Sequence, residues 1–292
     1  MICSACPRKC NAIRTESENI GGVCKMPLYP VVARAAVHMW EEPCISGKNG
    51  SGTVFFSGCS LGCVYCQNGE ISHKNFGKAI TPNRLSQIFA ELEEKNVHNI
   101  NLVNPTHFIY SINEAMNLRK PNIPVVYNSG GYDLPKTVEL ASAFCDIFLL
   151  DLKYITKERA LKYSKAADYP EIATAAILKC QNIVGDPVFD DNGMMKKGVI
   201  IRHLVLPHGL SETRKVIEWV KCNAPNAVFS LMSQYTPCGD LRLYPEINRK
   251  ISVSEHRKAL AMLSESGLEN TYCQQLSSSN ERFIPDFDLL GV

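Results

Sequence analysis

Short runs of β-branched and aromatic residues alternate along most of the chain with longer amphipathic segments. A first apolar run, residues 31–37, lies in a region that is otherwise irregular and rich in Cys, Pro and Gly. From about residue 52 onward the alternation becomes regular. Such a pattern predicts strands that are each followed by a helix.

Six strands are predicted within this regular region, at residues 53–56, 99–103, 124–127, 146–150, 199–206 and 227–232. Helix starts between and after them carry capping signals. Thr81 precedes Pro82, and Ser252 is followed by Glu255 in the pattern of a capping box. The Gly- and Asp-rich segment 185–198 is predicted to be an exposed loop.

Six β/α repeats predict an α/β fold in which helices cover a parallel sheet. Periodicity alone does not separate an open sheet from a barrel, but in both the ligand site lies beyond the C-terminal ends of the strands. We expect a cysteine-rich metal-binding segment at residues 1–50. We expect residues 51–292 to form the β/α unit with a C-terminal extension.

Composition narrows the class of protein. The 292 residues are 45% hydrophobic and 21% charged, which is the balance of a globular chain with a sizeable core. Because 31 basic residues meet 29 acidic ones, no excess of positive charge favours nucleic acid. No apolar run reaches the roughly 18 residues of a membrane helix, and the N-terminus lacks the layout of a signal peptide. We therefore expect a cytoplasmic protein that binds neither nucleic acid nor a membrane.

The chain contains 13 cysteines, an odd number that argues against a disulfide framework. Seven of them form two groups, one with Cys3, Cys6, Cys10 and Cys24 and the other with Cys59, Cys63 and Cys66. Clustered thiols in a reducing compartment indicate metal binding.

The second group has the spacing C-x3-C-x2-C and directly follows the strand predicted at residues 53–56. Three thiolates in one loop can hold three irons of a [4Fe–4S] cluster, which leaves the fourth iron open for a ligand. The alternative is a zinc knuckle or a group of reduced, buried cysteines.

This segment, with Tyr65 at the aromatic position of C-x3-C-x-aromatic-C, resembles the signature of the radical S-adenosylmethionine (SAM) superfamily. The resemblance implies a partial (β/α)6 TIM-like barrel in which SAM chelates the open iron. It also implies that one electron from the cluster cleaves SAM to methionine and a 5′-deoxyadenosyl radical, which abstracts a hydrogen atom from the substrate.

The resemblance places the SAM contacts at the ends of successive strands and implies a set of cofactor-binding residues: Tyr65, Asn104, Thr106, Asn128, Asp151, Lys153 and Arg202. The family's Gly-Gly-Glu is replaced here by residues 104–107, Asn-Pro-Thr-His, where Thr106 would equally serve as a helix cap. Asp151 and Lys153 match the Asp-x-Lys of the activating enzymes, and a surface ion pair is the alternative. His203 should face away from Arg202, because side chains alternate along a strand.

The first cysteine group suits zinc or a second iron–sulfur cluster, and free thiols are the alternative. A C-x2-C-Pro-x2-C start, the stretch at residues 41–47 and Cys-Gln-Asn at residues 66–68 resemble the PflX-type homologues of the pyruvate formate-lyase activating enzyme. This implies a glycyl-radical protein or peptide as substrate and flavodoxin or ferredoxin as electron donor. Two other functions stay open: a radical SAM enzyme that modifies another peptide or a small molecule, and a non-catalytic iron–sulfur or zinc electron-transfer module.

Overall fold

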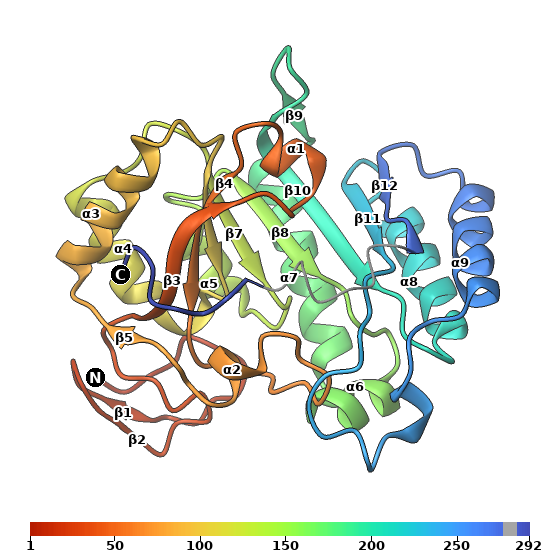
Figure 1. The fold of residues 1–292 in the computed structure, drawn as a ribbon, viewed down its shortest axis with the longest axis horizontal. Helices are drawn as coiled ribbons and strands as arrows, with labels where there is room; N and C mark the ends of the chain where they lie inside the picture. Colours follow the sequence, from red (N-terminus) through yellow and green to blue (C-terminus); the bar gives the residue numbers. More distant parts are fainter. Residues whose placement is uncertain (277–284) are drawn as a thin grey trace.

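The computed structural model describes residues 1–276 and 285–292. Its main sheet runs in the order β12-β11-β10-β8-β7-β6-β4-β3-β5, and all neighbours from β12 to β4 are parallel. In the described chain β12 and β5 are the two edges, so the sheet is an open, partial barrel (Figure 1). The strands are β3 Val31–His38, β4 Ser51–Phe56, β5 Lys78–Ala79, β6 Ile100–Val103, β7 Val125–Ser129, β8 Ile147–Asp151, β10 Met195–Leu204, β11 Val228–Met232 and β12 Thr271–Cys273.

The strands of the parallel region are buried on both faces, as expected for a sheet covered by helices. Tyr127 and Phe148 belong to the large core beneath the outer helices, whereas their neighbours Val126 and Leu149 belong to a smaller core on the concave face. Helices α3 and α4 flank one end of the sheet and α8 and α9 the other (Figure 1). The longer helices are α3 Pro82–Glu93, α4 Ile109–Leu118, α5 Pro135–Ala141, α6 Lys157–Ser164, α7 Tyr169–Val184, α8 Leu210–Asn223 and α9 Val253–Ser266.

The predicted caps are confirmed. The Thr81 side chain accepts a hydrogen bond from the backbone N–H of Arg84 at the start of α3. Ser252 and Glu255 form the reciprocal capping box that begins α9. Each cap satisfies backbone donors that have no partner within the helix.

The prediction of a loop over residues 185–198 is wrong for residues 188–189 and 195–198, which form strands. Strand β9, Val188–Phe189, pairs antiparallel with the start of β10, which begins at Met195. The polar residues between them make a tight turn in which the Asp190 carboxylate accepts hydrogen bonds from the backbone of Asn192 and Met194. Because the turn is rich in Asp, Asn and Gly, the sequence pattern indicated a loop and not a hairpin. Helix α7 and strand β12 were not predicted either.

The N-terminal segment contributes directly to the sheet. A small hairpin, β1 Ile13–Arg14 and β2 Asn19–Ile20, comes first, and β3 then pairs antiparallel with β4. The short helix α1, Pro43–Ser46, closes the N-terminal end of the barrel, because its Cys44 and Ile45 join the core of the concave face. No described helix is long and apolar enough to cross a membrane.

The end of the chain returns to β3. Leu289 donates its backbone N–H to the carbonyl of Ala33, and the carbonyl of Leu290 accepts from Ala35 at 2.8 Å. An ion pair of 2.6 Å between Arg34 and Asp288 also joins the end of the chain to β3. The last residues therefore lie along the strand that flanks the cysteine-bearing strand.

Candidate functional site

A cavity of about 530 Å³ lies at the C-terminal ends of the parallel strands. Strand termini, the loop after β4 and the segment before α1 line it together. Sequence-predicted site residues that line it are Cys63, Tyr65, Cys66, Asn128, Asp151, Lys153 and Arg202. Cys59, Asn104 and Thr106 are not among the described residues that line it. The topology thus brings most of the predicted site to one place.

The loop after β4 carries three thiols, and their sulfur atoms already accept or share hydrogen bonds. The Cys63 sulfur lies 2.9 Å from the Ser164 hydroxyl, and the Ser72 hydroxyl donates to Cys66 at 3.2 Å. The backbone N–H of Leu61 lies 3.3 Å from the Cys59 sulfur. Hydroxyl and amide donors of this kind stabilise sulfur that carries negative charge.

The three thiols fit a metal cluster in their chemistry. Burial and the neighbouring thiols raise the pKa of Cys63, and they raise that of Cys66 to about 12, while the Lys153 ammonium opposes both increases. Because Cys63 and Cys66 resist ionisation, the positive charge of bound iron is what would hold them as thiolates. Within the described residues, no group of three or more His, Cys, Asp or Glu side chains is already arranged around a metal position.

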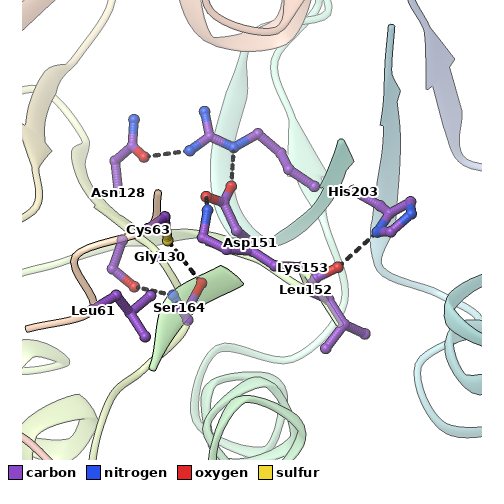
Figure 2. Close-up of polar contacts among 12 residues, drawn as sticks. Leu61, Cys63, Asn128, Gly130, Asp151, Leu152, Lys153, Ser164 and His203 are labelled. Atoms are coloured by element: carbon purple, nitrogen blue, oxygen red, sulfur yellow. Dashed lines mark hydrogen bonds and ion pairs between the residues drawn. The ribbon is translucent and has the colours of Figure 1, made fainter. Parts of the chain in front are cut away.

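Asp151, the last residue of β8, is the centre of a charged network on the cavity wall. Its carboxylate accepts from Lys153 at 2.5 Å and from the Arg202 Nε at 2.9 Å. A second guanidinium nitrogen of Arg202 donates to the Asn128 amide oxygen at 2.6 Å. Burial alone would raise the pKa of Asp151, but the charges of Arg202 and Lys153 hold it below its usual range. In the view of Figure 2, Asn128, Asp151, Lys153 and Cys63 form one group, and His203 lies apart from them.

Sequence reasoning missed two carboxylates that complete this wall. Glu41 accepts from Arg202 at 3.1 Å and from the side-chain amides of Asn101 and Asn128 at 2.9 and 3.2 Å. Glu42 is buried beside it and also lines the cavity. Their signal in the sequence was a pair of acidic residues directly before the apolar turn that becomes α1.

Asn104 and Thr106, which belong to the segment that replaces Gly-Gly-Glu, do not line the cavity in the described chain. Asn104 has a left-handed backbone with φ of 62°, and its side-chain amide donates to the carbonyl of Gly58, one residue before Cys59. The Thr106 hydroxyl is buried and donates to Asp133 at 2.6 Å. Asn104 thus supports the cysteine loop, and Thr106 belongs to a buried network behind the cavity.

Tyr65 fixes the loop from within. Its hydroxyl lies 2.6 Å from that of Tyr154, and its ring packs edge-on against Tyr163 and Tyr235. His203 faces the other side of β10, where its ring nitrogens contact the Leu152 carbonyl at 2.8 Å and the Thr213 hydroxyl at 3.0 Å (Figure 2). Alternation along the strand therefore separates Arg202 from His203, as the sequence predicted.

The four N-terminal cysteines also lie close together. Cys3, Cys6 and Cys24 are buried and Cys10 is half-buried. Burial, together with the thiols of Cys24, Cys3 and Cys10, raises the pKa of Cys6 to about 12. The Arg14 guanidinium lies 3.5 Å from the Cys3 sulfur and lowers the pKa of Cys24, whose burial raises it. Four thiols in one segment match in number the donor set of zinc or of an iron–sulfur cluster, although they are not arranged around a metal position in the described chain.

Comparison with known proteins gives three matches. The sequence model of the radical SAM superfamily matches residues 53–206, from β4 to just beyond the end of β10. An uncharacterized protein of Methanocaldococcus jannaschii is 31% identical over 280 residues, which cover 92% of this chain and 76% of the relative. A crystal structure of a domain of pyruvate-formate lyase-activating enzyme from Bacteroides vulgatus aligns over 66% of this chain and 91% of that chain, with 12% identity and a TM-score of 0.38. The matched residues 53–206 include the cysteine loop and the cavity-lining residues Asn128, Asp151, Lys153 and Arg202.

Proposed function

The chain belongs to the radical SAM superfamily, and on this premise we propose that it cleaves SAM reductively at a [4Fe–4S] cluster held by Cys59, Cys63 and Cys66. When bound, the reduced cluster supplies one electron to SAM, giving methionine and a 5′-deoxyadenosyl radical that takes a hydrogen atom from the substrate. The observation that carries the proposal is a single cavity lined by both the cysteine loop and the charged network of Asp151.

The chain's own residues prepare this cavity for SAM. The amino-acid end of SAM carries an ammonium and a carboxylate, and the wall offers both signs of charge through Asp151, Lys153 and Arg202. These charges are already fixed by mutual hydrogen bonds, so binding needs little rearrangement. Asn128 and Tyr65 line the same space, whereas Asn104 acts through the backbone of the cysteine loop.

The test is anaerobic formation of 5′-deoxyadenosine. The protein is reconstituted with iron and sulfide, reduced with dithionite and given SAM. We expect 5′-deoxyadenosine from the wild type and from Cys222→Ala, an exposed cysteine on α8 that serves as the matched control. Cys63→Ala should give none. Product from Cys63→Ala at the wild-type rate, or none from a fully iron-loaded wild type that binds SAM, would contradict the proposal.

We propose further that Cys3, Cys6, Cys10 and Cys24 hold a second metal. Counting metal per chain distinguishes the two forms of this site. About four irons with one zinc would make it a structural zinc site, and about eight irons would make it a second cluster. Iron at about four with no zinc would show that these thiols are free.

The finer substrate proposal is a backbone glycine of a glycyl-radical protein, with flavodoxin or ferredoxin as the electron donor. It is tested by presenting cell proteins labelled with α-deuterated glycine and measuring deuterium in 5′-deoxyadenosine. Deuterium transfer supports a glycine substrate. Its absence, with ample SAM cleavage, favours another peptide or a small molecule.

A further inference from the structure

Glu42 is the carboxylate of the cavity that is in direct contact with no cation of the described chain, although the Arg202 charge acts on it. Only 8% of the residue is exposed, and its Oε2 has no hydrogen-bond partner in the described part of the chain. It takes part in no ion pair among residues 1–276 and 285–292. An unpaired buried carboxylate is costly unless a ligand supplies the missing charge or donor.

The other charges of the cavity are already committed to one another. The lining contains three carboxylates, Glu41, Glu42 and Asp151, and two cations, Lys153 and Arg202. The three kinds of guanidinium nitrogen of Arg202 donate to Asp151, Glu41 and Asn128, and Lys153 pairs with Asp151. With all three carboxylates ionised the wall would carry an excess of one negative charge, and burial opposes this by raising the pKa of Glu41 and of Glu42. A cation bound beside Glu42 would favour its ionised form.

The third basic side chain among the described lining residues does not correct this imbalance. His38 also lines the cavity, and burial together with the Arg34 charge lowers its pKa to about 4. Its ring is therefore neutral at neutral pH. Burial raises the pKa of Glu42, the Arg202 charge lowers it, and the neighbouring Glu41 raises it again.

Glu42 and the cysteines line the cavity from different elements. Glu42 directly precedes α1, whereas Cys63 and Cys66 belong to the loop after β4. The Ser230 hydroxyl, which donates to Glu42, is on β11 two residues before the strand ends. A ligand at the cysteines and a second molecule at Glu42 would then share one cavity of about 530 Å³.

Aromatic rings line the cavity together with Glu42. Tyr272 is paired in register with Ser230, and both Tyr272 and Trp40 line the cavity. A carboxylate beside aromatic rings in a partly desolvated space is the usual environment for an ammonium or guanidinium group. The surroundings of Glu42 are thus complementary to a cation.

We propose that Glu42 is the counter-ion for an ammonium or guanidinium group of the substrate, bound between the cysteine loop and α1. The inference rests on the proposed function, since it assumes that SAM occupies the end near the cysteines. It narrows the substrate to a molecule that carries a primary amine or guanidine, such as a lysine- or arginine-containing peptide.

The test compares two probes that differ in charge. Nα-acetyl-lysine amide carries the ammonium, and Nα-acetyl-norleucine amide is its neutral, nearly isosteric counterpart. Their binding to the reconstituted, SAM-loaded protein is measured by saturation-transfer NMR titration. We expect the wild type to bind the lysine probe at least about tenfold more tightly than the norleucine probe. The Glu42→Gln variant should bind the two within about twofold, and Glu42→Asp should keep part of the preference.

Two controls distinguish the sources of the effect. Glu269→Gln removes an exposed carboxylate elsewhere and should leave the wild-type preference unchanged. SAM affinity, measured by calorimetry, should stay within about twofold in Glu42→Gln. A loss of SAM affinity as large as the loss for the lysine probe would mean that Glu42 serves the ammonium of SAM, and would overturn the substrate assignment.

Failure of this inference differs from failure of the proposed function. Equal binding of both probes by a wild type that binds and cleaves SAM would overturn the assignment of Glu42 alone. A wild type with full iron that neither binds nor cleaves SAM would overturn the proposed function, whatever the probes do.

Discussion

The Arg8 guanidinium donates to the backbone carbonyl of Ser60 at 2.6 Å, and so joins the N-terminal cysteine segment to the loop between Cys59 and Cys63. The same group donates to the carbonyl of Leu61 at 3.1 Å. Its other hydrogen bonds go to the backbone carbonyls of Ser164 and Lys165, at the end of α6. One side chain between Cys6 and Cys10 therefore holds four backbone acceptors around the proposed cluster.

Replacing Arg8 should loosen the cysteine loop. Hydrogen bonds from a charged donor contribute about 1.5–3 kcal/mol each when their acceptors are buried, and those of Arg8 are only partly buried. We expect Arg8→Ala to lower the free energy of unfolding by about 2 kcal/mol and to speed the loss of iron under a chelator. Urea unfolding and iron release measure the two effects. Arg242→Ala, which removes an exposed arginine, should change neither.

Asp151→Asn should destabilise the protein, because it leaves two buried cations with less compensation. Removing one partner of a buried ion pair costs about 3–5 kcal/mol, and retained contacts of Arg202 with Glu41 place the expected loss near 3 kcal/mol. The matched control is Asp240→Asn, which breaks an exposed pair with Arg242 and should leave the free energy of unfolding nearly unchanged, because solvent screens that pair. Equal losses in urea unfolding would contradict the central place of Asp151.

Gly131 should not tolerate a side chain. Its φ is +78°, and an added Cβ would meet the backbone carbonyl of Asp151. Gly131→Ala should therefore lose about 1–3 kcal/mol of stability and displace the end of β8, which also lowers SAM affinity. Gly130→Ala is the comparison, since there the nearest contact is 3.1 Å from the flexible Leu61 side chain. Thermal unfolding and SAM calorimetry on both variants check the difference.

His107 should make the protein sensitive to mild acid. It is buried, and burial together with the Arg14 charge lowers its pKa from an ordinary value of 6.5 to about 3. Below pH 6.5 the unfolded chain takes up a proton that the folded chain refuses until about pH 3. Stability should fall by about 1.4 kcal/mol per pH unit across that window, and not above it.

The measurement is urea unfolding between pH 8 and pH 5 for the wild type and for His107→Gln. Glutamine can still donate to the Ser57 carbonyl that His107 contacts at 2.7 Å, so the comparison isolates the titration. The variant should lose about 2 kcal/mol less than the wild type between pH 6.5 and pH 5. His208→Asn, at an exposed position, should follow the wild type. Parallel curves for wild type and His107→Gln would refute the assignment.

Much of the fold was predictable because its signals are local. The β/α alternation, the cap at Thr81 and the capping box at Ser252 depend on residues within a few positions of one another. The three-cysteine loop is equally local, and its spacing carried the resemblance to the superfamily that matches residues 53–206. The alternation of side chains along β10 likewise predicted that Arg202 and His203 lie on opposite faces of the strand.

The contents of the cavity were decided by contacts between distant residues. Glu41 meets Arg202 across 161 positions, and Arg8 meets Lys165 across 157. No periodicity encodes such pairs, because they depend on how far the sheet curves and on where the segment before β4 crosses it. The sequence alone determined the six central strands of the sheet and the grouping of the thiols. Only the tertiary structure placed Thr106 behind the cavity and Glu42 inside it, since burial of α1 against the concave face carries the preceding carboxylates into the barrel.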